Sequence, residues 1–254
     1  MITLTLIGMG SGSPQHLTLE GVAALQAADL ILLPDKGDDK AELRAVRELI
    51  CAEHLGPNVK TVQFSIPNRE DDPSYLAAVE RWHDAIARRW LDAIAAHEER
   101  IAQVALLIWG DPSLYDSSLR IAERLPGLGL TVQLRVVPGI TSVQALTAAH
   151  GIPLNALAGS VLFTTARQLR QHGWPQGQQR IVVMLDAGAA YEVLPGHDYD
   201  IWWGAYVGMP QQVLIHGQLS EVAPLIQQQR AELRARYGWI MDVYILAQRS
   251  QDQS

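Results

Sequence analysis

Leu6-Ile7-Gly8-Met9-Gly10-Ser11-Gly12-Ser13-Pro14 joins a short apolar run to a loop with three glycines. Two further glycine loops follow, Trp109-Gly110-Asp111-Pro112-Ser113 and Val137-Pro138-Gly139-Ile140-Thr141, and each also comes after an apolar run typical of a strand. Glycine adopts backbone torsions closed to other residues and lets a main chain approach a ligand closely. Three such loops together predict one shared ligand-binding cleft.

The first half of the chain is predicted to alternate strands and helices. Continuous apolar runs at 30–33 and 104–108 are typical of strands buried on both faces of a parallel sheet. Residues 73–97 carry apolar side chains at intervals of three, four and seven, which indicates one long amphipathic helix. The Gly110 loop follows the run at 104–108, and ligands of open α/β sheets bind outside the carboxyl ends of the strands.

The second half indicates a mixed sheet. Its last three predicted strands are close enough in sequence to pair as hairpins. We expect two α/β domains, residues 1–137 and 138–254. The predicted strands are 161–165, 180–185, 201–207, 212–216 and 240–246, and a helix is predicted at 219–236.

Composition excludes several classes of protein. A formal net charge of −7 over 254 residues argues against non-specific nucleic-acid binding, which needs a basic face. The single Cys51 excludes an intramolecular disulfide and fits a reducing compartment. No apolar run approaches the roughly 20 residues of a membrane span, and residues 1–7 do not resemble a signal peptide. We therefore expect a cytoplasmic protein with no membrane or nucleic-acid partner.

The first loop departs from the dinucleotide-binding fingerprint G-x-G-x-x-G. Gly12 comes one position early, Ser13 stands where the third glycine belongs, and Pro14 interrupts the expected helix. A nicotinamide-dependent reductase is therefore only a remote alternative. The eight histidines are scattered without metal-ligand spacing, so no metal is expected.

Taken together, the loops resemble the tetrapyrrole methyltransferase family, whose members use S-adenosylmethionine (SAM) in a cleft between two α/β domains. The resemblance covers nearly the whole chain and implies that fold, together with a homodimer. The matching segments, in order, are 8–14 with Leu17-Thr18, Gly110-Asp111-Pro112, 138–142, 151–154, 164–167, Met184 and 208–212.

Residues 32–43 and the long helix at 73–97 differ from what uroporphyrinogen, precorrin-2 and diphthine members of this family lead us to expect. They favour the branch that methylates C1 of precorrin-5 and releases the extruded acetyl group as acetate. The products would be precorrin-6A and S-adenosylhomocysteine (SAH). Asp35 stands where the family pattern leads us to expect a basic residue. Another precorrin methyltransferase, a diphthine synthase-like enzyme and a module that binds SAM without turnover are the alternatives.

Methyl transfer to a carbon nucleophile needs alignment and exclusion of water, not a covalent catalyst. Asp111 is the sharpest cofactor candidate, because its carboxylate can accept hydrogen bonds and favours a positive sulfonium. It is also a typical turn residue before proline. By resemblance, the cofactor contacts are Pro14, Asp111, Leu114, Thr141, Ser142, Met184, Ala205 and Ile240.

Deacetylation requires attack of water on the acetyl carbonyl, which a positioned base accelerates by roughly 10²–10⁴-fold. The catalytic candidates for this step are Tyr115, Asp38 with its neighbour Asp39, and His150. The substrate is an anionic tetrapyrrole, whose carboxylates are bound best by arginine or lysine. The substrate-binding candidates are Gly10, Lys36 and Arg167.

Overall fold

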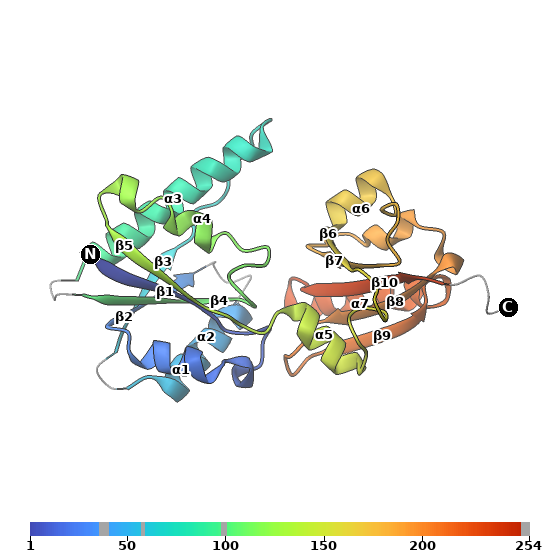
Figure 1. Ribbon diagram of the computed structural model, residues 1–254, viewed down its shortest axis with the longest axis horizontal. Coiled ribbons are helices and arrows are strands. Elements are labelled where there is room, and N and C mark those ends of the chain that lie inside the picture. Colours follow the sequence, from blue (N-terminus) through green and yellow to red (C-terminus); the bar gives the residue numbers. More distant parts are fainter. Residues whose placement is uncertain (36–40, 57–58, 98–100, 250–254) are drawn as a thin grey trace. The chain divides into compact units, whose positions relative to one another are not determined.

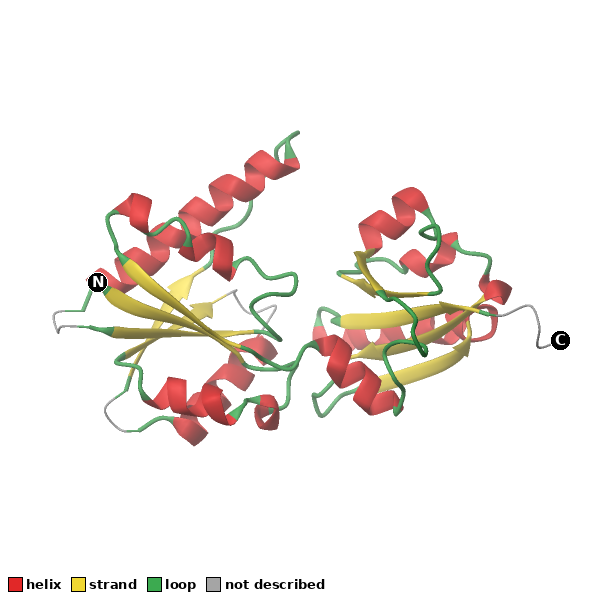
Figure 2. Ribbon diagram, in the orientation of Figure 1, coloured by secondary structure: helices red, strands yellow, loops and turns green. Residues whose placement is uncertain are grey.

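The computed structural model describes residues 1–35, 41–56, 59–97 and 101–249. The chain divides into two compact units, 1–141 and 142–254, and the first ends four residues beyond the expected domain boundary. Each unit is built on a five-stranded sheet with helices packed against it (Figures 1 and 2). The expected α/β class is confirmed for both.

The N-terminal unit alternates strands and helices as predicted. All its strands are parallel, in the order β3-β2-β4-β1-β5. Its elements are β1 (Ile2–Gly8), α1 (Leu19–Gln26), β2 (Leu30–Asp35), α2 (Ala41–His54), β3 (Lys60–Ser65), α3 (Tyr75–Ala95), β4 (Gln103–Ile108), α4 (Ser118–Ala122) and β5 (Val132–Val137), with short 3-10 helices at Pro14–His16 and Pro126–Leu128.

The direction of the strand order reverses between β1 and β4. After β1 the chain crosses to β2 on the far side of β4, and after β4 it crosses to β5 on the far side of β1. In open α/β sheets, such a switch point leaves a crevice outside the carboxyl ends of the strands. Gly8 pairs with Ile108, so the loops after β1 and β4 leave the sheet at the same level.

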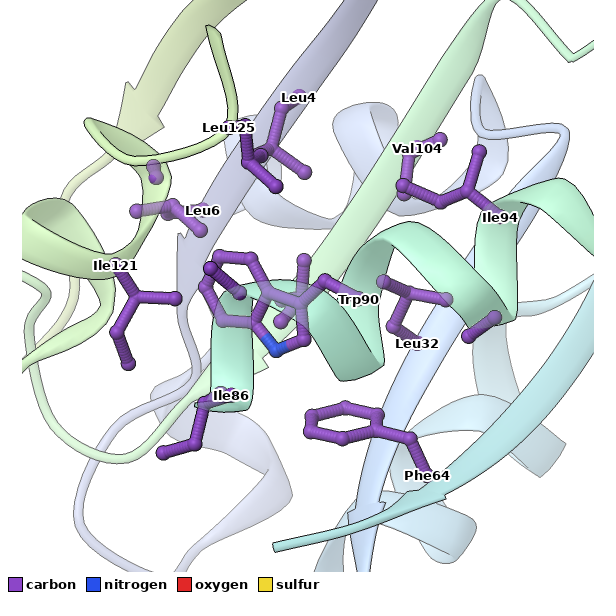
Figure 3. Packing of buried hydrophobic residues seen from close by; sticks show 14 of the residues in the cluster. Leu4, Leu6, Leu32, Phe64, Ile86, Trp90, Ile94, Val104, Ile121 and Leu125 are labelled. Carbon is purple, nitrogen blue, oxygen red and sulfur yellow. The ribbon is translucent and has the colours of Figure 1, made fainter. Parts of the chain in front are cut away.

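Two apolar layers cover the two faces of this sheet. On one face, Leu4, Leu6 and Leu32 pack against Trp90 of α3, whose indole meets Phe64 edge to face at 6.4 Å (Figure 3). The amphipathic helix predicted at 73–97 is therefore confirmed as α3, with one face buried against the sheet. Each such side chain, once fully buried, stabilises the fold by roughly 1.5–3 kcal/mol.

The opposite face is covered by α1 and α2 (Figure 1). Thr18 caps α1, because its hydroxyl oxygen accepts a hydrogen bond from Gly21 N at 3.0 Å. Cys51 of α2 is buried here, and burial raises the pKa of its thiol to about 11. The cysteine thus packs as a small apolar side chain.

The C-terminal unit contains the expected mixed sheet, in the order β6-β7-β10-β8-β9. Strands β6 and β7 are parallel, and the other neighbouring pairs are antiparallel. Its elements are α5 (Ser142–His150), β6 (Leu162–Thr165), α6 (Ala166–His172), β7 (Arg180–Met184), β8 (Tyr199–Ala205), β9 (Val213–Gln218), α7 (Leu219–Tyr237) and β10 (Asp242–Gln248), with short 3-10 helices at Ala190–Val193 and Gly196–Asp198.

Across the described ranges of both units, no helix is long and apolar enough to cross a membrane.

Candidate functional site

The three glycine loops of the sequence meet at the switch point of the N-terminal sheet. Gly10 and Gly110 form an antiparallel bridge, in which Gly110 N donates to the Gly10 carbonyl oxygen at 2.8 Å and Gly10 N to the Gly110 carbonyl oxygen at 3.3 Å. Gly139, after β5, lies against both Gly8 and Gly110. The three loops thus lie together within this unit, and the ligand-binding cleft that they predict stays a prediction.

Close approach between the loops themselves explains these glycines. A Cβ atom on Gly139 would lie 2.2 Å from the Gly110 carbonyl oxygen and 2.6 Å from Gly8 Cα, and one on Gly8 would lie 2.5 Å from Gly139 N. Gly10 has φ +83°, and a Cβ there would lie 2.1 Å from His16 Cβ. The sequence alone predicts that these glycines allow the close approach of a ligand. In the structure they let three main chains pack directly against one another.

Asp111 ties two of these loops together through its buried carboxylate. Its Oδ2 accepts a hydrogen bond from Gly139 N at 2.8 Å, and its Oδ1 accepts from Ser113 N at 2.8 Å and from Ser113 Oγ at 2.5 Å. Burial by itself raises the pKa of Asp111, but these hydrogen bonds together outweigh it and hold the pKa below its ordinary value. Asp111 is therefore an ionised carboxylate whose hydrogen bonds join the loops after β4 and β5, and we call it the ionised clamp.

The rest of the Gly110 loop presents Tyr115 to solvent. Tyr115 is 43% exposed and has φ +50°, a left-handed conformation that costs about 1–2 kcal/mol in a non-glycine residue. Burial of its inner part raises the pKa of Tyr115, so its hydroxyl stays protonated at neutral pH. It can donate a hydrogen bond to a ligand but is unsuited to act as a base. Leu114, beside it, is half-buried.

The loop after β1 runs first into a short 3-10 helix, and α1 begins only at Leu19. Ser13 caps a 3-10 helix of only three residues, which Pro14 begins. A helix N-terminus attracts phosphate through aligned main-chain dipoles, and three residues supply few of them. This geometry disfavours the dinucleotide alternative.

The cofactor candidates of the second unit lie at one edge of its sheet. Met184 ends β7, Ala205 ends β8, and Ile240 stands two residues before β10. Because β10 runs antiparallel to both strands and pairs Asp242 with Ala205, its beginning lies beside their ends. We call Met184, Ala205 and Ile240 with their immediate neighbours the strand-end edge.

Arg167 also belongs to this side of the sheet. Thr165 pairs with Met184 and caps α6, so Arg167 lies in the first turn after the strand-end edge, with an exposed side chain.

The remaining candidates lie elsewhere in the chain. Ser142 begins α5, directly after Thr141, and both are half-buried. Lys36, Asp38 and Asp39 lie outside the described residues.

His150 lies at the end of α5, against the main chain of β8. Its Nε2 is 3.1 Å from the Trp203 carbonyl oxygen, so this nitrogen carries the proton and donates. The ring also meets His216 edge to face at 5.9 Å. Burial lowers the pKa of His150, which keeps the imidazole neutral at pH 7. One of its two nitrogens is thus engaged within the C-terminal unit.

Sequence reasoning missed several buried charges. Arg47 of α2 donates from Nε to the Leu107 carbonyl oxygen at 3.2 Å, near the end of β4, and burial lowers its pKa to about 10. Asp186 and Arg230 are buried in the second unit, and the side chain of Asp242 is 2% exposed. Among these four residues, only Asp186 has a sequence signal that could have indicated a special role, because it follows an apolar run closely.

Within the described ranges, no group of three His, Cys, Asp or Glu side chains is placed to hold a metal.

Comparison with known proteins gives one consistent result. Residues 3–223 match the model of the family described as Tetrapyrrole (Corrin/Porphyrin) Methylases. The chain is 41% identical over 249 residues to a precorrin-6A synthase [deacetylating] from a Sinorhizobium species, covering 97% of this chain and 95% of that one. It is 31% identical over 156 residues to a precorrin-2 C(20)-methyltransferase from Sinorhizobium, 58% of each chain.

Solved structures agree with these sequence comparisons. A cobalamin synthesis related protein (CobF) from Corynebacterium diphtheriae superposes with a TM-score of 0.84 at 37% identity, covering 97% of this chain and 98% of that one. Uroporphyrin-III C-methyl transferase from Thermus thermophilus, complexed with S-adenyl homocysteine, gives a TM-score of 0.59 at 21% identity, covering 96% and 97%. The second likeness shows a shared fold.

Proposed function

The chain belongs to the tetrapyrrole (corrin/porphyrin) methylase family, and from this membership we propose that it methylates C1 of precorrin-5 with SAM and releases acetate. The observation that carries the proposal is the similarity, along nearly the whole chain, to a deacetylating precorrin-6A synthase. The products are precorrin-6A, SAH and acetate, and the step belongs to cobalamin biosynthesis.

The residues present fit SAM better than a phosphate-bearing cofactor. SAM carries no phosphate, and the packed glycine loops place main-chain groups and the Asp111 carboxylate at the switch point, where the loop after β1 runs into a 3-10 helix of only three residues. When bound, SAM supplies an electrophilic methyl group. Asp111, Leu114 and Thr141 in the first unit, and Met184 and Ala205 in the second, are the proposed contacts that orient it. Pro14, Ser142 and Ile240 complete the proposed set.

Binding experiments separate this proposal from the reductase alternative. Isothermal titration calorimetry with SAH should give saturable binding with a stoichiometry of one per chain, whereas NADPH should give no heat of binding. Binding of NADPH without binding of SAH would overturn the proposed cofactor. Binding of SAH without turnover of any precorrin would favour the alternative of a module that only binds SAM.

Tyr115 is our proposed participant in acetate release. Its protonated hydroxyl, on a strained and exposed turn beside Asp111, is suited to donate a hydrogen bond to the acetyl carbonyl. Water then adds to that carbonyl, the bond from its carbon to the macrocycle breaks, and the bonding electrons return to the macrocycle. Asp38 and His150 remain candidates for the base that takes the proton from water.

Tyr115→Phe is expected to slow acetate release about 10²-fold, because loss of one hydrogen-bond donor to a developing oxyanion typically reduces the rate by about this factor. SAH affinity should stay within about threefold of wild type, because only the hydroxyl is removed. The measurement is a time course of free acetate with precorrin-5 and SAM. Tyr75→Phe, at the half-exposed start of α3, is the matched control. Acetate release at the wild-type rate in Tyr115→Phe would exclude this role.

We also propose that the enzyme is a cytoplasmic homodimer, as the family resemblance implies, and that its substrate is an anionic tetrapyrrole bound in part by Gly10, Lys36 and Arg167. Light scattering of the purified protein would measure the assembly.

Arg167→Met should raise the KM for the tetrapyrrole without changing SAH affinity.

A further inference from the structure

Three charged side chains are buried together behind the strand-end edge of the C-terminal unit. Asp186 follows β7, Asp242 begins β10, and Arg230 lies in the middle of α7. Their side chains are 0%, 2% and 8% exposed, respectively. Burying charged groups costs desolvation free energy, and apolar residues in their place would give a core of equal or greater stability. The presence of these three charges therefore needs another physical reason.

The Arg230 guanidinium joins two strand ends. Its Nη1 donates to Asp242 Oδ2, and its Nη2 donates to the main-chain carbonyl oxygen of Asp186 at 2.9 Å. Asp242 Oδ2 also accepts a hydrogen bond from Trp203 Nε1 of β8 at 2.8 Å. One side chain of α7 therefore ties the beginning of β10 to the turn after β7, and through Asp242 to β8.

The Asp186 carboxylate fixes the same turn from the other side. Its Oδ1 accepts from Gly188 N at 2.8 Å and from Arg170 Nη2 at 2.5 Å, and its Oδ2 accepts from Ala190 N at 2.6 Å and from Tyr244 Oη at 2.7 Å. Carboxylates that accept several hydrogen bonds hold their surroundings in one geometry. The turn after β7 is thus determined by contacts to α6, α7 and β10.

These contacts hold a strained residue in place. Leu185, between Met184 and Asp186, has φ +58° and is 64% exposed. A left-handed conformation costs a leucine about 1–2 kcal/mol and persists only where the surroundings over-determine it. Leu185 is thereby exposed beside the half-buried Met184 at the strand-end edge, where the proposed cofactor contacts lie.

The titration of Asp242 is consistent with a geometric role. Burial raises its pKa to about 6, despite the Arg230 guanidinium beside it. A carboxyl group whose pKa is higher in the folded than in the unfolded protein stabilises the fold below its ordinary pKa of 3.8, and that contribution is lost as the pH rises through about 6. The ionised carboxylate at neutral pH therefore reduces the free energy of unfolding, yet it is the form that binds Arg230 most strongly.

Building on the proposed function, we infer that Arg230 is a positioning residue for SAM: by holding the Asp186 carbonyl and the Asp242 carboxylate, it sets the spacing of the strand ends that contact the cofactor. Arg230 is buried within the unit, so it acts through Met184, Ala205 and their neighbours. Its role is to keep this edge in the geometry that binds SAM. The strand ends are then already ordered, so binding of the cofactor costs less conformational entropy.

The test compares SAH affinity and stability across variants. Arg230→Met should weaken SAH binding and raise the KM for SAM by about 10–100-fold, since misplaced positioning groups cause losses of this size. The kcat should fall by less than about threefold, because the reacting groups are unchanged. Arg230→Lys, which can still donate to Asp242, should recover part of the affinity. The double variant Arg230→Met/Asp242→Asn removes the unpaired buried charge, so it should regain thermal stability while SAH affinity stays low.

Arg180→Met is the matched control at the opposite end of β7. Arg180 donates to the carbonyl oxygens of Pro153 at 2.8 Å and Leu154 at 3.0 Å, so its loss also removes a guanidinium bound to main chain in this unit. It should lower the melting temperature but leave SAH affinity within about threefold of wild type.

The outcomes separate this inference from the proposed function. Absence of SAH binding by wild type would overturn the proposed function itself. Wild-type binding together with unchanged affinity in Arg230→Met or in the double variant would overturn the role of Arg230 alone. Equal losses in Arg180→Met and Arg230→Met would show a purely structural contribution and would also overturn it. If Arg230→Met does not fold, the double variant decides in the same way.

Discussion

Gly139→Ala is expected to abolish measurable methyl transfer and to lower the melting temperature by about 6–12 °C. The added Cβ would lie 2.2 Å from the Gly110 carbonyl oxygen and 2.6 Å from Gly8 Cα. Both obstacles are main-chain atoms of other loops, so no side chain can rotate away. We expect a loss of about 3 kcal/mol or more, at the upper end of the range for overpacking. Differential scanning calorimetry and SAH titration of the purified variant measure the two effects.

Gly139→Ala is expected to increase the separation of the three loops. Gly127→Ala is the matched control, because Gly127 lies in the same unit and a Cβ there meets no atom within 4 Å. Its stability and SAH affinity should equal those of wild type. A Gly139→Ala protein with wild-type affinity would show that the packed loop junction is not needed for cofactor binding.

Asp111→Asn is expected to reduce kcat/KM for methylation about 10²-fold and the free energy of unfolding by about 1–3 kcal/mol. The carboxylate accepts from Gly139 N through one oxygen and from Ser113 through the other, and asparagine replaces one acceptor by an NH2 group. At least one main-chain donor then loses its partner. The ionic acceptor that a cofactor cation would face is lost as well.

The pH dependence of stability gives a second measure of Asp111. Its pKa is below the ordinary value of 3.8 in the folded protein, so its contribution is present above pH 3.8 and is lost as the pH falls through the lower, folded-state pKa. The stability difference between wild type and Asp111→Asn should therefore be full at pH 7 and shrink below pH 3.8. A difference that grows on acidification would contradict the ionised clamp.

Asp29→Asn is the matched control for this variant. Asp29 Oδ2 accepts hydrogen bonds from Ala102 N and Gln103 N, both at 2.8 Å, at the beginning of β4 and away from the glycine loops. One amide oxygen can keep both bonds, so stability should change little. SAH affinity should match wild type within about threefold.

Sequence patterns predicted the elements of the fold well, because those elements follow from local periodicity and burial. The apolar runs became β2 and β4, and the long amphipathic stretch became α3, with Trp90 in the core. Loop placement was also predictable, since the glycine loops follow parallel strands whose carboxyl ends share one edge of the sheet.

The reason for each glycine was not accessible from sequence. Gly8, Gly110 and Gly139 are far apart in the chain, and only the folded sheet shows that they pack against one another. The buried charges were missed for a related reason. Arg230 stands in a helix among glutamines and other charged residues, a pattern typical of a solvent-exposed face. Its burial depends on Asp242 and on the turn at Asp186, which tertiary contacts bring to it.

The most direct test of the central claim is to incubate the protein with enzymatically generated precorrin-5 and methyl-labelled SAM, and to follow the label and free acetate separately. We expect label in the macrocycle and one molecule of acetate for each methyl group transferred, since each turnover forms one C–CH3 bond and breaks one bond to the acetyl group. Label in the macrocycle without acetate would contradict the assignment to this step and place the enzyme at another methylation. Neither product, despite tight binding of SAH, would contradict precorrin-5 as the substrate.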